Sequence, residues 1–180
     1  MLDLLNAVLK GNHNLVQAIL NKNPPQSHLN QALLNAAGNG RLVMVRKLLN
    51  KGANINHKNN TNLSPLISAS IGGYTNVAKE LLNRGASRNG LALHHAIIFR
   101  QIPMIKLLIL HGVPVKQEHL MLTRNRRVTN AIEEATKNLR RRQGLAVVAV
   151  GNVRSGNPRP SNRNLPRPLI REIMRMAFPK

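Results

Sequence analysis

Apolar residues fall into short clusters that recur along the first 115 positions of the chain. Each unit starts with a cluster around an alanine, and these alanines are Ala7, Ala36, Ala69 and Ala96. A second apolar cluster with helical spacing follows, and it ends at Ile19-Leu20, Leu48-Leu49, Leu81-Leu82 or Leu107-Leu108. The alanines are 29, 33 and 27 positions apart. This period predicts stacked helix pairs, because one pair alone could not bury its apolar face.

The third unit shows the predicted helix pair most clearly. Ser64 suits the N-cap of a first helix, and Pro65 suits its first turn. Gly72-Gly73 stops that helix, since glycine adopts left-handed backbone angles easily. The next apolar residues share one face of a second helix. They are Val77, Ala78, Leu81 and Leu82.

The units also differ in their connections. The loop before the third unit is rich in asparagine between positions 54 and 62, and asparagine tolerates turns and left-handed angles. In the fourth unit, Arg100 stands where the other units have glycine, and Pro103 lies near the start of the second helix. The last spacing is six residues shorter than the 33-residue one, which predicts a shorter loop between the third and fourth units.

Several of these segments resemble the ankyrin-repeat family. Ser64-Pro65-Leu66-Ile67-Ser68-Ala69 resembles the family's Thr-Pro-Leu-His-x-Ala, and Leu93-His94-His95-Ala96 keeps its second half. Residues 48–56 and 81–87 resemble the segment that closes a repeat. The resemblance covers residues 1–115 and implies an all-α solenoid of four helix-turn-helix repeats. It also implies that His94 is the histidine that hydrogen-bonds between repeats.

The remaining residues divide into three predicted parts. Residues 116–143 predict a degenerate helical capping repeat, with helices over 117–124 and 128–142, which shields the last apolar edge of the array. Residues 144–164 are rich in Gly, Ser, Asn, Pro and Arg and predict a flexible basic linker. Residues 165–180 predict an amphipathic C-terminal helix.

The C-terminal segment resembles the first helix of an F-box and the F-box-like tail of many poxvirus ankyrin proteins. This resemblance implies that the tail recruits a ubiquitin-ligase adaptor, although Pro168 replaces the acidic residue of the motif. The adaptor-binding candidates are Leu165, Pro166, Leu169, Ile170, Ile173 and Met174. The alternative is a terminal helix that packs back onto the repeats.

Composition narrows the possible chemistry. The chain has no cysteine, which excludes disulfides and thiolate metal sites, and its one aspartate is Asp3. It has no glycine-rich phosphate loop. His94-His95 and His57 lack the acidic partners that orient a catalytic histidine. We therefore expect a monomeric protein that is not an enzyme and has no cofactor or metal.

Apolar runs are too short for a membrane helix, and no signal peptide is evident at the N-terminus. These features predict a cytoplasmic protein, with the nucleus as an alternative. The irregular repeats resemble ankyrin proteins that intracellular bacteria or large DNA viruses direct at host cells. A host-directed effector is therefore one hypothesis.

Charge is strongly unbalanced, with 27 Lys and Arg against 6 Asp and Glu, for a net charge of +21. This excess predicts an acidic partner protein and salt-sensitive association. The alternatives are a solvated basic face or a surface that contacts a polyanion, either nucleic acid or anionic lipid. The polyanion candidates are Arg124, Arg126, Arg127, Lys137, Arg140, Arg141 and Arg142.

The family resemblance implies that a partner protein binds the concave surface, made by the inter-repeat loops and the outer face of each first helix. The candidates are Asn6, Lys10, Asn35, Asn39, His57, Lys58, Asn60, Ser68, His95 and Phe99. Phe99 is the strongest anchor, because aromatic side chains dominate binding hot spots. The alternative role of Phe99 is core packing.

Overall fold

The computed structural model describes residues 2–123 and 125–143 of the 180-residue chain. Over these residues it contains ten helices and no strand, so the predicted all-α solenoid is confirmed. The helices are α1 (Leu2–Lys10), α2 (His13–Asn21), α3 (Gln26–Gly38), α4 (Leu42–Asn50), α5 (Pro65–Ile71), α6 (Thr75–Asn83), α7 (Leu91–Ile98), α8 (Ile102–Leu110), α9 (Gln117–Met121) and α10 (Arg126–Gln143).

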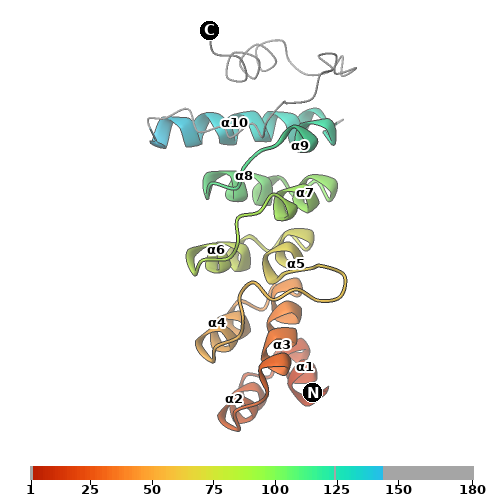
Figure 1. Cartoon of the computed structure of the whole chain (residues 1–180), viewed down its shortest axis with the longest axis vertical. Coiled ribbons are helices and arrows are strands. Elements are labelled where there is room, and N and C mark those ends of the chain that lie inside the picture. Colours follow the sequence, from red (N-terminus) through yellow and green to blue (C-terminus); the bar gives the residue numbers. More distant parts are fainter. Residues whose placement is uncertain (1, 124, 144–180) are drawn as a thin grey trace.

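The helices form two parallel columns along the long axis of the molecule (Figure 1). The first helices of successive pairs pack on one another, α1 on α3, α3 on α5 and α5 on α7. The second helices form the other column, in which α4 packs on α6, α6 on α8 and α8 on α10. The loop of residues 51–64 projects from the side of the stack, beside α5.

The third helix pair forms as its sequence predicts. Ser64 caps α5, and its Oγ accepts a hydrogen bond from the backbone N–H of Ile67 at 3.4 Å. Pro65 occupies the first turn, where its missing N–H leaves no hydrogen bond unmade. The four apolar residues of α6 named above are all buried, so this helix presents its predicted face to the core.

Small side chains let the first helices pack closely. Ala36, Ala69 and Ala96 have no exposed surface, and Ala7 is 1% exposed. A larger side chain at these positions would push neighbouring helices apart, because protein cores are packed without spare volume. The longer side chains of the second helices fill the rest of the core.

A recurring contact seals the junction between successive repeats. The first helices α1, α3 and α5 are each followed by a glycine with positive φ, at Gly11, Gly40 and Gly73. A side chain from the next repeat covers each glycine: Arg41 over Gly11, the ring of Tyr74 over Gly40, and Gln101 over Gly73. Arg41 also donates a hydrogen bond to the Leu9 carbonyl at 3.0 Å, and Gln101 donates one to the Ile71 carbonyl at 3.4 Å.

The junction at Gly40 gives a test of this packing. We expect Gly40→Ala to lower the free energy of unfolding by about 2–3 kcal/mol, because it combines left-handed strain with overpacking. A Cβ at Gly40 would lie 2.5 Å from the Tyr74 ring. Gly52 also has positive φ, but a Cβ there would meet nothing within 4 Å, so Gly52→Ala should cost only about 1 kcal/mol. Urea unfolding measures both, and equal losses would contradict the proposed role of Tyr74.

Asparagine side chains order the loops between repeats. Asn30 Oδ1 accepts hydrogen bonds from the Gln26 side chain and from the backbone of Asn54. Asn56 Oδ1 accepts one from the backbone of Ser87 at 2.8 Å, which ties the loop of residues 51–64 to the connection between α6 and α7. Asn62 has a φ of 64°, the left-handed conformation that the Asn-rich composition predicts.

The structure corrects the assignment of the inter-repeat histidine. No hydrogen bond joins the His94 ring to another described residue, and its ring instead meets the ring of His119 edge-on. His119 has no exposed surface. Its Nδ1 accepts from the Lys116 N–H at 3.0 Å, and its Nε2 lies 3.1 Å from the Gly90 carbonyl. The prediction was wrong because the residues around His94 match the family motif, whereas the residues around His119 do not.

The cap also differs in detail from its predicted helices. α9 ends at Met121 rather than at position 124, and Thr123 closes the turn by donating its hydroxyl to the Leu120 carbonyl at 2.7 Å. α10 begins at Arg126, two residues before the predicted start. Asn125 Oδ1 accepts the Arg127 N–H at 2.9 Å, so a polar side chain starts the helix ahead of its first apolar residue.

Candidate protein-binding surface

The position before each buried alanine forms a line of side chains along the column of first helices. Its members are Asn6 on α1, Asn35 on α3, Ser68 on α5 and His95 on α7. Asn6 is exposed and the other three are partly buried. Burial lowers the pKa of His95, and the neighbouring His94 lowers it further. The line is therefore polar and, near neutral pH, largely uncharged on this face.

A second line lies three residues after each alanine and includes Lys10, Asn39 and Phe99, all exposed. The side-chain amide of Asn39 donates a hydrogen bond to the Asn35 carbonyl at 2.8 Å, so part of its donor capacity is already used within the protein. Phe99 is 50% exposed, which excludes the core-packing alternative. The geometry leaves this ring available to a partner, at the end of α7.

The loop candidates lie in the projecting segment of residues 51–64. Lys58 and Asn60 are exposed, and His57 is partly buried. Asn59 organises this loop, because its Oδ1 accepts from the Thr61 backbone, the Thr61 hydroxyl and the Leu63 backbone. A fixed loop presents its neighbouring side chains at a lower entropic cost on binding.

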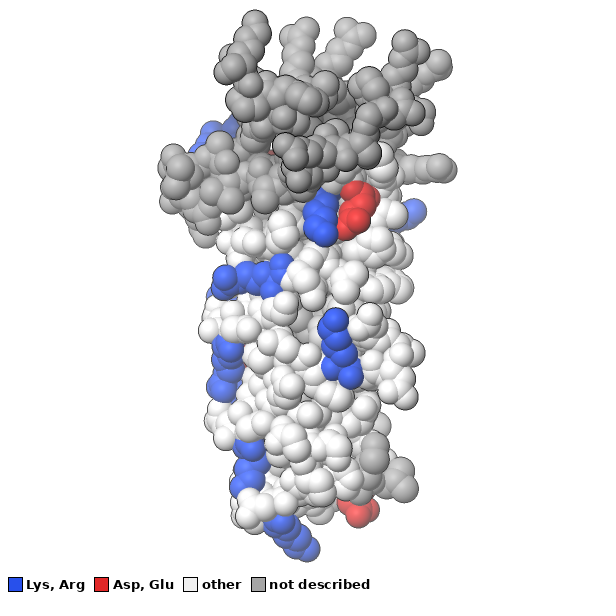
Figure 2. All heavy atoms as spheres, viewed as in Figure 1, with Lys and Arg blue, Asp and Glu red and all other residues white. Residues whose placement is uncertain are grey.

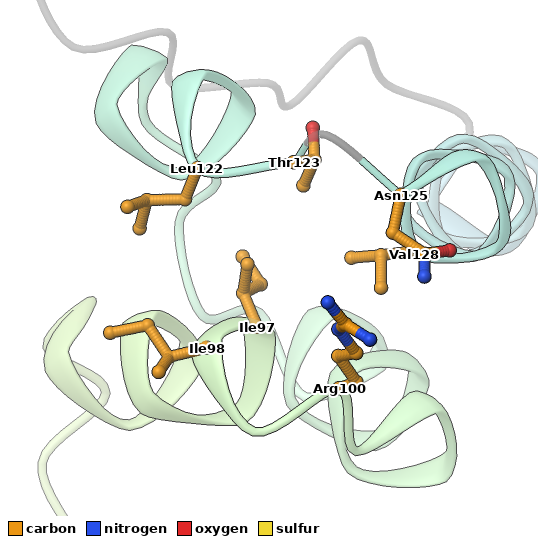
Figure 3. Close-up of a pocket in the computed structure, with 7 residues that line it drawn as sticks. All are labelled: Ile97, Ile98, Arg100, Leu122, Thr123, Asn125 and Val128. Atoms are coloured by element: carbon orange, nitrogen blue, oxygen red, sulfur yellow. The ribbon is translucent and has the colours of Figure 1, made fainter.

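A pocket of about 400 Å³ lies between the end of α7 and the start of α10. Its lining residues are Ile97, Ile98, Arg100, Leu122, Thr123, Asn125 and Val128. Figure 3 shows the apolar side chains around a central space, with the Arg100 side chain extending into it. This pocket was not predicted from the sequence, although Arg100 at a position where other repeats have glycine was a signal.

Cations recur at the ends of the second helices. Lys22, Lys51 and Arg84 are the C-cap residues of α2, α4 and α6. A positive charge there stabilises the helix dipole, so part of the basic excess has a structural role. Figure 2 shows Lys and Arg side chains spaced along the edge of the molecule on the side of the second helices.

One acidic side chain sits within this basic edge. Glu80 forms ion pairs with Arg46 at 3.0 Å and Arg84 at 2.7 Å. Hydrogen bonds from the two guanidinium groups lower the pKa of Glu80, so it stays charged at neutral pH. This pairing links α4 to α6. Most other Lys and Arg side chains of the basic edge form no ion pair with an Asp or Glu in the described parts of the chain.

The polyanion candidates lie on the cap helix as far as they are described. Arg126, Arg127, Lys137 and Arg141 are exposed on α10. Arg140 and Arg142 also belong to α10. Arg124 and the adaptor-binding candidates of residues 165–174 lie outside the described residues.

Residues 2–123 and 125–143 contain no cluster of three His, Asp or Glu side chains that could hold a metal ion. None of the helices described here is long and apolar enough to cross a bilayer.

Stacked helix pairs with exposed side chains at repeating positions define a helical repeat array, a class that binds partners along an extended surface. The family model for ankyrin repeats (three copies) matches residues 4–89 and 33–119, which together exceed half of the chain. The chain therefore belongs to the ankyrin-repeat family. Ankyrin repeats are protein–protein interaction modules, and proteins built from them are generally non-enzymatic scaffolds.

Curated relatives match a short part of the chain. Over 64 residues the chain is 41% identical to Ankyrin repeat and KH domain-containing protein 1 of Homo sapiens and to Ankyrin repeat and KH domain-containing protein mask of Drosophila melanogaster. The identity to protein mask-1 of Caenorhabditis elegans is 38%. Each match covers 36% of this chain and 2% of the relative, so the likeness concerns only a short segment of each protein.

Proposed function

We propose that this protein binds an acidic partner protein on the face formed by its first helices and the projecting loop of residues 51–64. The half-exposed ring of Phe99 carries this proposal, because a large apolar group without a core role is suited to a binding surface. The polar line through Asn6, Asn35, Ser68 and His95 supplies hydrogen-bonding groups beside it.

The charge of the chain supports an acidic partner. With a net charge of +21, long-range attraction speeds the encounter with a negatively charged surface and selects against basic ones. Lys10 and Lys58 are exposed cations on the proposed binding face. Association should weaken as salt rises, because exposed charges are screened over about 8 Å at physiological ionic strength.

Phe99→Ala should weaken capture of the partner about tenfold or more, since hot-spot truncation costs roughly 2 kcal/mol or more. The experiment uses the full chain as bait in quantitative affinity purification, at low salt and at high salt, with nuclease added. The expected result is an acidic protein whose recovery falls with Phe99→Ala and with salt.

Leu15→Ala is the matched control, because Leu15 is 45% exposed but lies on α2, outside the proposed face. It should leave capture unchanged. Equal recovery with both variants would contradict the proposal. A signal that nuclease abolishes would instead favour the polyanion alternative, with α10 as the contact surface.

A further inference from the structure

The junction after α7 breaks the pattern that seals the other repeats. Gly11, Gly40 and Gly73 are each covered by a side chain of the next repeat. After α7, Arg100 stands at the position that glycine occupies in those repeats, and it lines the pocket between α7 and α10. Leu122, Thr123 and Asn125, which follow the short α9, line this space without filling it.

Arg100 holds a backbone conformation that its side chain does not favour. Its φ is 54°, in the left-handed region where glycine and asparagine are common and other residues are strained. The other non-glycine residues with positive φ in the described chain are Asn23 and Asn62. Strain of this kind persists mainly where the residue serves a purpose that a relaxed residue could not.

Two of the polar side chains at the pocket, Arg100 and Asn125, can donate hydrogen bonds into it, whereas the Thr123 hydroxyl donates to the Leu120 carbonyl. The guanidinium of Arg100 forms no ion pair with any acidic residue that the structure describes. Asn125 uses its Oδ1 to accept the Arg127 N–H, so its side-chain amide hydrogens are left to donate. Arg126 and Arg127 are exposed in the first turn of α10, where the helix dipole disfavours cations. The Arg100 guanidinium and the Asn125 amide thus give the pocket donors suited to a negatively charged group.

The remaining walls are apolar, from Ile97, Ile98, Leu122 and Val128. The apolar surface continues beyond the pocket, because Ile98 and Phe99 at the end of α7 are 49% and 50% exposed. Met121 and Leu122 at the end of α9 are 56% and 41% exposed. Exposed apolar residues on both sides of a pocket suit a macromolecular ligand rather than a small one.

We propose that this pocket anchors a peptide segment of a partner protein in which an apolar side chain adjoins an Asp or Glu. The apolar side chain enters between α7 and α10, and the carboxylate accepts two parallel hydrogen bonds from the Arg100 guanidinium. Asn125 donates to the same carboxylate. This inference deepens the proposed function, since it names the chemistry of the partner segment.

The experiment is a selection of a displayed random heptapeptide library on the full chain, counter-selected on Arg100→Gly. The expected result is a set of peptides with Asp or Glu next to Leu, Ile, Met or Phe. As synthetic peptides, they should bind Arg100→Gly at least tenfold more weakly than the unchanged chain. Replacing the Asp or Glu by its amide should cause a similar loss.

Two variants separate loss of the site from loss of the fold. Arg100→Gly restores the residue type of the other repeats, so its melting temperature should equal or exceed that of the unchanged chain. Arg88→Gly removes the same charge from another exposed arginine and should keep full binding. Arg100→Lys keeps the charge without the paired donors and should bind with intermediate affinity.

Several outcomes would overturn the proposal: no enrichment, enriched peptides without acidic residues, or equal binding to Arg100→Gly and Arg88→Gly. Tight binding of free 4-methylpentanoate, as strong as that of the peptides, would overturn the assignment to a peptide. These results leave the Phe99-dependent capture untouched, so failure of the pocket and failure of the proposed function are distinguishable.

Discussion

Leu81→Ala should lower the free energy of unfolding by about 2–5 kcal/mol, the range for large-to-small changes in a packed core. Leu81 has no exposed surface and lies on α6, in the middle of the array. α6 packs against α5, α4 and α8, so the cavity would weaken the contacts of one repeat with both of its neighbours. In a linear array these neighbour contacts carry much of the stability.

Urea unfolding followed by circular dichroism measures this loss, with Leu15→Ala as the control. Leu15 is 45% exposed, and its truncation should change stability by less than about 0.5 kcal/mol. A second transition in Leu81→Ala would show that the two ends of the array have uncoupled. A loss below 1 kcal/mol would contradict the central place of α6 in the core.

His119→Ala should cost about 3–4 kcal/mol at pH 7.5, because it combines a buried cavity with two hydrogen bonds lost. The imidazole has no exposed surface, accepts from the Lys116 N–H, and lies against the Gly90 carbonyl, which is 29 residues before His119 in the chain. Since Nδ1 accepts, the neutral tautomer carries its proton on Nε2 and donates to Gly90. His13→Ala, at an exposed histidine, is the control and should have little effect.

The same side chain should make stability fall at acid pH. Burial lowers the pKa of His119 below its usual value near 6.5, with opposing effects from Glu118 and the Gly90 hydrogen bond. Below about pH 6.5 the unfolded chain therefore binds a proton that the folded chain does not. Stability is full above that pH and is lost as pH falls toward the folded-state pKa.

Urea unfolding between pH 7.5 and pH 5.5 tests this dependence. His95 and His111 have pKa values lowered mainly by burial, so they contribute with the same sign. His119→Ala should therefore reduce the slope of stability against pH without abolishing it. An unchanged slope would show that His119 is not a proton-linked group.

The helix pairs could be predicted from sequence because their signals are local. Ser64, Pro65 and Gly73 set the limits of α5 through their own backbone preferences. The spacing of Val77, Ala78, Leu81 and Leu82 marks the buried face of α6 within a single helix. The recurrence of these signals identified the ankyrin repeats and, with them, a protein-interaction module.

The site was only partly predictable. Phe99 could be named as a candidate, but its exposure depends on what packs against the end of α7, and the sequence left core packing open. The role of Glu80 was also hidden, because Arg46 lies 34 residues away along the chain. Position within a helix is a local property, whereas burial and ionic pairing depend on the neighbouring repeat.

By itself, the sequence determined the repeat, the helix pairs, the left-handed glycines and the basic excess, since each follows from side chains close together along the chain. That His119 joins two repeats and that a pocket lies beside Arg100 became evident from the stacking of the helices in three dimensions. The physical reason is that both features form between segments about 25 to 30 residues apart, whose contact exists only when the helix pairs stack.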